Sequence, residues 1–263
     1  MKVQTHRPDP AAGHDILAGP HATLETLRAG RRKIRRILLA RPERAGVAEA
    51  IRHLAAERGV VVEVRSRVDL DRLAMGLSHQ GVVVEAGPFP YVEAEEVVSM
   101  AGRAGQTAFL IVLDGIQDPQ NLGAIIRTAE AAGAHGLILP RDRAAGVTPA
   151  AVRASAGAAE HLPVARVTNV AAFLEWVKGR GLWVVGTDAS GGCLLHAADL
   201  QAPLILVIGS EGRGLRPLVK RRCDFLVRIP LAGRVASLNA SSAAAVCIFE
   251  VVRQRWRRQA GPS

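Results

Sequence analysis

Apolar runs and amphipathic stretches alternate along most of this chain, and their periods predict its helices and strands. In the first third, the pattern predicts a compact α/β unit within residues 14–86. Helices are expected near 21–30, 47–59 and 68–77, and strands near 33–40, 60–64 and 81–86.

The second half contains longer apolar runs, which are typical of strands buried on both faces of a mostly parallel sheet. These strands are expected at 109–114, 136–140, 182–186, 204–210 and 225–230. A last helix is expected from about Ser237 to about Arg258. Because ligands bind at the carboxyl ends of such strands, the loops that follow them are the informative ones.

Breaks in this pattern divide the chain into parts. Residues 1–13 are polar and contain proline, which predicts a disordered tail. Residues 87–106 contain two prolines and several acidic residues, so we expect a linker with a short helix there. The alternating pattern resumes over 107–258, the expected second domain.

Composition narrows the class of protein. The chain has 263 residues, 49% of them hydrophobic, yet no apolar run reaches the roughly 18–20 residues of a membrane span. The first residues lack the apolar core of a secretory signal, so we expect a cytoplasmic protein. Three cysteines stand far apart without histidines at ligand spacing, which favours free buried thiols over disulfides or a metal site.

A formal net charge of +10 favours a polyanionic partner. Because aromatic residues make up only 3% of the chain, contacts to phosphate backbones are expected rather than stacking on single-stranded bases. An alanine- and arginine-rich composition from a GC-rich coding sequence accounts for the charge equally well. A dense basic cluster is predicted to bind RNA, the alternative being a solvated basic face. It comprises Arg28, Arg31, Arg32, Lys33, Arg35 and Arg36.

The first informative loop lies in DPQNLGAIIRTAEAAG. Asp118 is expected to cap a helix that ends at Gly133. Asn121 falls in the first turn of this helix, and Arg127 lies off its apolar stripe. Taken alone, Asn121 reads as a surface residue and Arg127 as the partner of Glu130 one turn on.

The second loop, IGSEGRGL, follows a buried strand and carries Glu211 among glycines that allow close approach of a ligand. It is neither a Walker motif nor a dinucleotide-binding G-x-G-x-x-G motif. The third loop leads into the last helix, where Ser237, Asn239, Ser241 and Ser242 crowd the first turn. One residue is enough to cap a helix, so capping leaves most of these polar side chains unexplained.

In this order and spacing, the two stretches above and IPLAGRVASLNASSAAAV closely resemble the three motifs of the SpoU (TrmH-type) RNA 2′-O-ribose methyltransferases of the SPOUT superfamily. The resemblance covers about residues 107–258. The first domain, ending in SHQGVVVEA, resembles that family's RNA-binding substrate domain. The arrangement is most similar to the RlmB branch, which methylates a guanosine ribose in the peptidyl-transferase loop of large-subunit ribosomal RNA.

The resemblance implies a trefoil knot in the second domain and a homodimer formed through the knotted face and the last helix. It also implies S-adenosylmethionine as cofactor, and no metal. The residues implied to line the cofactor pocket are Gly186, Thr187, Gly209, Ile229 and Leu238.

The resemblance further assigns Arg127 to the activation of the ribose 2′-hydroxyl. Because a guanidinium is almost always protonated, we interpret Arg127 as a phosphate clamp and an electrostatic partner of the developing alkoxide. The residues implied to orient the RNA and the loops are Asn121, Glu211, Ser237 and Asn239. The alternatives are a methyltransferase acting on transfer RNA or on another ribosomal RNA loop, and an RNA-binding assembly protein without activity.

Overall fold

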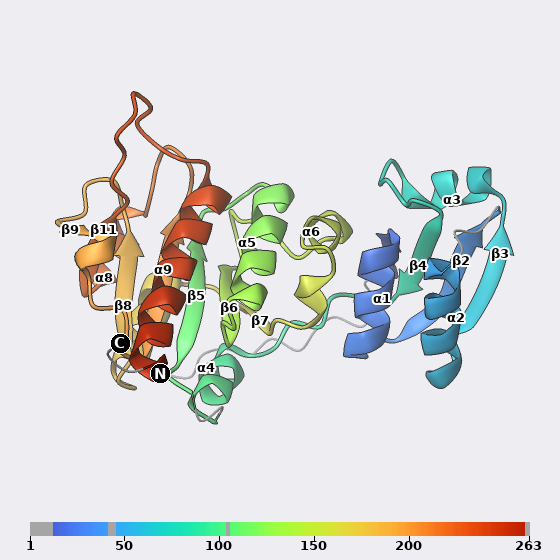
Figure 1. The fold of residues 1–263 in the computed structure, drawn as a ribbon, viewed down its shortest axis with the longest axis horizontal. Coiled ribbons are helices and arrows are strands. Elements are labelled where there is room, and N and C mark those ends of the chain that lie inside the picture. The colour runs from blue at the N-terminus through green and yellow to red at the C-terminus, as the bar shows by residue number, and fades with distance from the viewer. Residues whose placement is uncertain (1–12, 42–45, 104–105, 261–263) are drawn as a thin grey trace.

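The computed structural model describes residues 13–41, 46–103 and 106–260, and two β-sheets organise them (Figure 1). Each half of the chain contributes one sheet, as the alternating pattern predicts. The disordered tail predicted for residues 1–13 lies, except for Gly13, outside the described residues. Within the described ranges, no helix combines the length and apolar composition that a membrane crossing needs.

The first sheet has four strands in the order β1-β4-β2-β3, with β2 and β3 parallel and the other pairs antiparallel. Its strands are β1 (Asp15–Ala18), β2 (Ile34–Ala40), β3 (Val61–Arg65) and β4 (Val82–Ala86). The helices of this half are α1 (Pro20–Ala29), α2 (Val47–Glu57) and α3 (Arg67–Ala74). The pattern located all of these elements except β1, whose four residues are too short for a period to show.

The second sheet has seven strands in the order β7-β6-β5-β10-β8-β11-β9, and its paired strands are all parallel. Its strands are β5 (Phe109–Asp114), β6 (Gly136–Pro140), β7 (Val164–Val167), β8 (Trp183–Thr187), β9 (Cys193–Leu194), β10 (Leu204–Gly209) and β11 (Phe225–Arg228). Its helices are α4 (Ala94–Arg103), α5 (Pro119–Ala131), α6 (Pro149–Ala154), α7 (Val170–Lys178), α8 (Pro217–Arg222) and α9 (Ala240–Ala260), with short 3-10 turns at Ala158–Glu160 and Leu195–Ala197. The mostly parallel sheet is confirmed, and β7 and β9 are additions.

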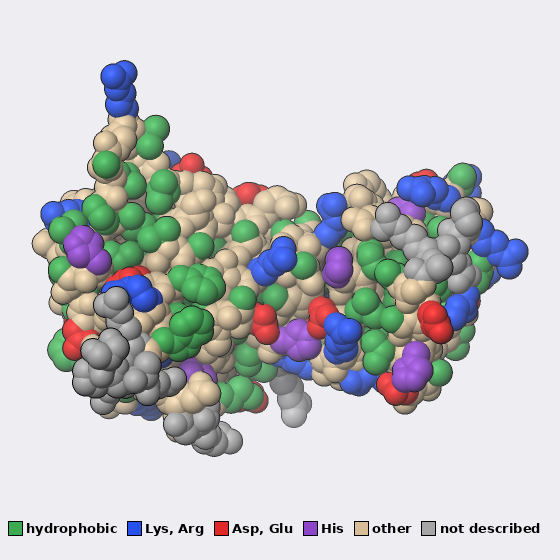
Figure 2. All heavy atoms as spheres, in the orientation of Figure 1, with side chains coloured by type: hydrophobic (Ala, Val, Ile, Leu, Met, Phe, Trp, Pro, Cys, Tyr) green, Lys and Arg blue, Asp and Glu red, His purple; other side chains and the backbone are tan. Residues whose placement is uncertain are grey.

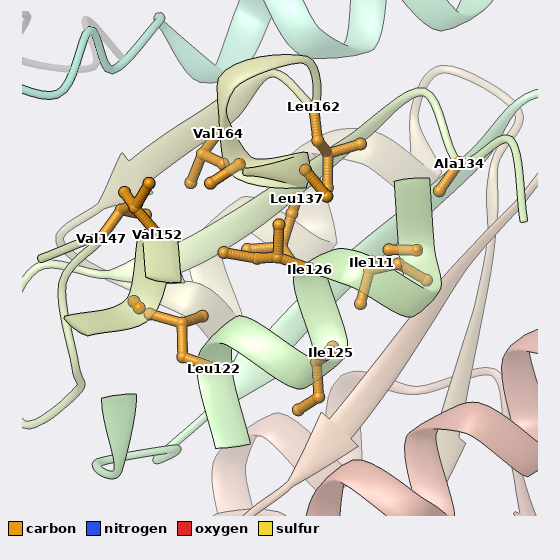
Figure 3. Packing of buried hydrophobic residues seen from close by; sticks show 14 of the residues in the cluster. Ile111, Leu122, Ile125, Ile126, Ala134, Leu137, Val147, Val152, Leu162 and Val164 are labelled. Atoms are coloured by element: carbon orange, nitrogen blue, oxygen red, sulfur yellow. The ribbon is translucent and has the colours of Figure 1, made fainter. Parts of the chain in front are cut away.

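Helices cover both faces of this sheet, so the successive apolar residues of its central strands are buried on alternate sides. On one face, Ile111 of β5 and Leu137 of β6 pack against Ile125 and Ile126 of α5 (Figure 3). The same cluster includes residues of α6 and α9. On the other face, residues such as Leu110 of β5 pack with α4, α7 and α8.

The segment predicted as a linker, residues 87–106, does more than connect the sheets. Val92 forms a parallel bridge with Ala165, and α4 packs on β6 and β7. The Tyr91 hydroxyl accepts a hydrogen bond of 2.7 Å from the backbone N–H of Val147. Much of this segment therefore belongs to the second domain.

The two domains also meet across a buried ion pair. The side chains of Arg32 and Glu160 are both fully buried, and the Arg32 guanidinium lies 2.9 Å from a Glu160 carboxylate oxygen. Asp15 pairs with the same guanidinium at 2.7 Å, and Arg31 donates to the backbone carbonyls of Glu160, Leu162 and Pro90. Burial raises the pKa of Glu160, while Arg32 acts in the opposite direction.

This interface corrects the prediction that the whole basic cluster binds RNA. Arg31 and Arg32 are turned into the domain boundary, and Arg36 pairs with Glu63 and Glu85 on the first sheet. A buried guanidinium needs carboxylate or carbonyl partners, and for Arg32 these come from both domains, as Asp15 and Glu160. The members that remain exposed are Arg28, Lys33 and Arg35.

Candidate active site

The three loops singled out in the sequence converge at the carboxyl edge of the second sheet. β5 and β10 are neighbours, with Asp114 and Gly209 paired at their ends, and α9 packs against α5. This arrangement places the start of α5 beside the start of α9 (Figure 1), and a hydrogen bond from Asn239 to Glu211 joins the loop after β10 to them. The convergence is the expected consequence of parallel strands whose carboxyl ends share one edge.

Asn239 has two roles among the polar residues that crowd the start of the last helix. Its Oδ1 accepts hydrogen bonds from the backbone N–H and the hydroxyl of Ser241, at 2.9 and 2.6 Å. Its Nδ2 donates to Oδ1 of Asn121 at 3.0 Å and to Oε2 of Glu211 at 3.4 Å. One amide therefore caps α9 and joins the three motifs.

This cap also corrects the predicted start of the helix. α9 begins at Ala240, not near Ser237, because the Asn239 side chain occupies the capping position. Ser237 lies before the helix in an exposed loop. It is thus free of the capping role that the sequence left open for it.

The loop after β10 is a tight reversal that presents Glu211. Ser210 and Gly214 exchange two backbone hydrogen bonds of 3.1 and 2.9 Å around it. A Cβ on Gly209 would lie 2.4 Å from the carbonyl carbon of Gly214, so only glycine allows this approach. The close approach that Gly209 allows is therefore that of the chain's own backbone at Gly214.

Asp114 is a residue of this edge that the sequence interpretation missed. Its carboxylate has no exposed surface and accepts from Nε of Arg216 at 2.6 Å and from the Arg216 backbone N–H at 2.8 Å. These bonds tie the end of β5 to the chain that follows the Glu211 loop. A carboxylate at the end of a fully apolar strand is the signal that could have identified it.

Beside the Glu211 loop lies a cavity of about 380 Å³. Four of the five residues predicted to bind the cofactor line it, together with Ser237 and Glu211; the four are Thr187, Gly209, Ile229 and Leu238. Gly186 does not line the cavity. A Cβ there would lie 2.6 to 2.8 Å from the side chains of Cys223, Leu226 and Leu215, so packing explains this glycine.

Charged groups border the same cavity. Asp188 lines it and pairs with Lys220 at 2.9 Å. Burial acts to raise the pKa of Asp188, but hydrogen bonds from Ser190 and Lys220 outweigh it and lower the pKa. Arg228, also in the lining, donates to the backbone carbonyl of Gly191 at 2.5 Å. The cavity thus combines an ionised carboxylate with apolar walls.

Arg127 stands apart from the cluster formed by Asn121, Glu211 and Asn239. It lies on α5, six residues beyond Asn121, which corresponds to about 9 Å along a helix axis. Its side chain is exposed, and within the described residues it makes no hydrogen bond or ion pair. The alternative pairing with Glu130 is absent, so the guanidinium is available to a ligand.

The cysteines are free thiols, as expected. Cys247 is buried, whereas Cys193 and Cys223 are only partly covered. Burial raises the pKa of Cys223 and of Cys247 to about 12, which makes both poor nucleophiles. Among the described residues, no three His, Cys, Asp or Glu side chains gather as a metal site would require.

Comparison with known proteins finds a matching family model for each of the two domains. The family model described as "SpoU rRNA Methylase family" matches residues 108–249, and the one described as "RNA 2'-O ribose methyltransferase substrate binding" matches 16–92. The chain is 45% identical over 242 residues to YacO of Bacillus subtilis, described as a TrmH family tRNA/rRNA methyltransferase, covering 92% of this chain and 96% of that one. It is 41% identical over 237 residues to the 23S rRNA (guanosine-2'-O-)-methyltransferase RlmB of Pseudomonas aeruginosa, covering 90% and 95%.

The fold is likewise shared with a solved structure. The SpoU methyltransferase AviRb of Streptomyces viridochromogenes, in complex with AdoMet, superposes with a TM-score of 0.77 and 30% identity, covering 95% of this chain and 92% of that chain. The cavity beside Glu211 fits such a cofactor, because apolar Ile229 and Leu238 suit an adenine ring. The chain therefore belongs to the SpoU (TrmH-type) family of S-adenosylmethionine-dependent RNA 2′-O-ribose methyltransferases.

Proposed function

We propose that this protein methylates the 2′-hydroxyl of a guanosine in the peptidyl-transferase loop of large-subunit ribosomal RNA. The observation that supports it is the similarity to RlmB, which extends over 90% of the chain and so includes the substrate domain as well as the methyltransferase domain. A transfer RNA substrate is the alternative, because the name of YacO includes both RNA classes. The cytoplasmic location predicted from the sequence follows from a ribosomal substrate.

S-adenosylmethionine supplies a methyl group that its positively charged sulfur already activates. The residues that would hold it are Thr187, Gly209, Ile229 and Leu238, which line the cavity. The chain must then align the 2′-oxygen with the methyl carbon and stabilise the charge that develops on this oxygen. The new O–C bond forms as the C–S bond breaks, and the hydroxyl proton leaves to solvent.

Arg127 is the residue to which we assign the stabilisation of this oxygen. A guanidinium carries five donors, and that of Arg127 has no partner within the described residues. It therefore suits a phosphate and a developing alkoxide better than it suits proton abstraction. Asn121, Glu211 and Asn239 keep the surrounding loops in register through their mutual hydrogen bonds, and Ser237 lines the cavity that would hold the cofactor.

We also infer a homodimer through α9. Val246, Phe249 and Trp256 are spaced by three and seven residues, so they share one helix face, and all three are exposed. Figure 2 shows hydrophobic side chains gathered over this helix. The opposite face of α9 is buried in the core of the domain. A helix that is apolar on both faces fits a second copy of the chain.

The trefoil knot stays a prediction of the family resemblance. It is supported by the order of the strands, in which β10 lies between β5 and β8 and β11 lies between β8 and β9. It is also supported by backbone crossings without room for a side chain. A Cβ on Gly191 would lie 2.8 to 3.1 Å from the backbone of Leu226, Val227 and Arg228.

Mapping of ribose methylation in a strain that lacks the gene tests the substrate. We expect the loss of one 2′-O-methylguanosine from the peptidyl-transferase loop and its return when the gene is restored. Loss of a methyl group from transfer RNA, with ribosomal RNA unchanged, would replace the proposal with the transfer RNA alternative. Complete methylation of both RNAs in this strain would support the remaining alternative, an RNA-binding assembly protein without methyltransferase activity.

A further inference from the structure

A polar groove lies between the two domains, separate from the cofactor cavity. Its volume is about 240 Å³. The substrate domain contributes Ser78 and Gln80, from the loop before β4, and His21 from the start of α1. The methyltransferase domain contributes Gln120 from the first turn of α5 and Arg153 from α6. The groove therefore exists only where the domains meet.

The groove and the active site share the first turn of α5. Gln120 directly precedes Asn121, whose amide belongs to the cluster with Asn239 and Glu211. In Figure 1 the loop before β4 and the loop before α9 rise on the same side of the molecule. Because Gln120 lines the groove and Asn121 is the next residue of α5, a strand with one ribose at the cluster would have a neighbouring nucleotide beside the groove.

The loop that presents Gln80 is held by a buried histidine. Nδ1 of His79 accepts from the backbone N–H of Gly81 at 3.0 Å, and its Nε2 lies 2.8 Å from a carboxylate oxygen of Asp71. Gln80 itself has a positive φ of 50° and an exposed side chain. This backbone is uncommon for a residue with a Cβ, so the SHQG turn is fixed by the His79 bonds.

The two walls of the groove are also fixed relative to each other. The buried pair of Arg32 and Glu160 spans the same boundary, and Arg31 adds three hydrogen bonds to backbone carbonyls across it or next to it. A Cβ on Gly157 would lie 2.6 Å from Cβ of Glu25, which shows how closely α1 approaches the chain after α6. The groove is thus preformed and has a set width.

We propose that this groove binds the nucleotide next to the methyl acceptor in the same RNA strand, with Gln80 and Gln120 as specificity-determining residues. The inference rests on the proposed function, which supplies the RNA strand. Carboxamides offer a donor and an acceptor side by side and so match the edges of nucleobases. The Arg153 guanidinium matches a phosphate. Within the described residues, none of these three side chains has a hydrogen-bond or ion-pair partner of its own.

The test compares full-length variants on total RNA from a strain that lacks the gene, because this RNA contains the target whichever molecule it is. We expect Gln80→Ala, Gln120→Ala and Arg153→Ala each to raise the KM for RNA by about 3- to 10-fold, the scale of one hydrogen bond or charged contact, with kcat little changed. The affinity for S-adenosylmethionine, measured by calorimetry, should stay at the wild-type value in all three and serves as the folding control.

Arg221→Ala is the matched control for loss of a positive charge. Arg221 is exposed on α8, a helix on the far side of the methyltransferase domain from the groove (Figure 1). We expect its KM to remain near the wild-type value. KM values for the three groove variants that equal the value for Arg221→Ala would overturn the proposal.

Binding of the same RNA, measured separately by fluorescence anisotropy, distinguishes failure of the groove from failure of the proposed function. If the wild-type protein transfers no methyl group, the proposed function fails, and weaker binding by the three groove variants still supports the groove. Unchanged binding by all three would overturn the groove, whether or not methyl transfer is seen. A change of preference for the base beside the acceptor in Gln80→Ala or Gln120→Ala would support base recognition.

Discussion

Asn239 donates from Nδ2 to Oδ1 of Asn121 over 3.0 Å, although 118 residues separate them in the chain. The other side of the same amide, Oδ1, caps α9. A single side chain therefore couples the start of the last helix to the first motif and, through Glu211, to the second. The capping role and the connecting role can be separated by substitution, because they use different atoms.

The substitution Asn239→Asp tests the connecting role. Aspartate caps helices as well as asparagine does, so the free energy of unfolding should change by no more than about 1 kcal/mol. The new carboxylate cannot donate and faces the carboxylate of Glu211, so turnover should fall by roughly 100-fold, the scale of a lost transition-state contact. Thermal denaturation and methyl-transfer assays measure the two effects.

Asn239→Ser is the uncharged control, because serine caps well but is too short to replace the amide donor. We expect it to lose turnover with stability retained. Wild-type turnover in both variants would leave Asn239 with the capping role alone.

Ser237→Ala tests whether the Ser237 hydroxyl contributes to turnover through the cavity that it lines. Ser237 lies outside α9 and makes no hydrogen bond within the described residues, so the stability of the protein should stay the same. Because Ser237 lines the cavity, we expect turnover to fall while the melting temperature is constant. A lower melting temperature would mean that Ser237 supports the loop instead.

The sequence predicted strands well where runs of apolar residues are long, and β5 and β6 have the predicted limits. It could not predict that Arg32 is buried, because a basic cluster has the same local pattern whether it faces solvent or carboxylates from another domain. The contact between Asn239 and Asn121 is also invisible to a local pattern. Its signal was indirect: more polar residues at the start of a helix than capping requires.

Arg127→Ala should separate binding from catalysis. Arg127 is exposed, does not line the cofactor cavity and has no partner within the described residues, so its removal leaves the cavity intact. Calorimetry should therefore show wild-type affinity for S-adenosylmethionine, while methyl transfer collapses. Arg127→Lys keeps the charge but loses the planar set of donors, and we expect only partial recovery. Equal loss of cofactor binding and transfer would mean that the role given to Arg127 is wrong.

Asp114→Ala should loosen the loop that presents Glu211. It removes the buried carboxylate that accepts from the Arg216 backbone and side chain. An unsatisfied buried donor costs about 1–3 kcal/mol, so we expect a loss of stability of that size and weaker cofactor binding. Arg216→Ala keeps the backbone bond, and its half-exposed side chain makes a smaller loss the expected result. Equal losses in the two variants would contradict the importance of the backbone bond.

Phe249→Glu tests the homodimer. Phe249 is about half exposed on the apolar face of α9, so a carboxylate there should cost little folding stability in a monomer. In a dimer it would be buried without a partner, and the protein should then elute as a monomer in size-exclusion chromatography. Val61→Glu, at an exposed valine on the substrate domain, is the control and should leave the wild-type elution unchanged. A monomeric wild-type protein would refute the dimer.

The last prediction concerns the contact between the domains. Arg32→Met leaves Glu160 buried without its main counter-ion, which typically costs about 3–5 kcal/mol when the partner is removed. Arg32→Met with Glu160→Leu removes both charges, so most of the loss should be recovered, and a double-mutant cycle by chemical denaturation measures the coupling.

Burial raises the pKa of Glu160, so its ionisation opposes folding as pH rises from the unfolded value through the folded one. The single variant should therefore lose more stability at pH 8 than at pH 5. A cost below about 1 kcal/mol, independent of pH, would mean that the two domains separate in solution.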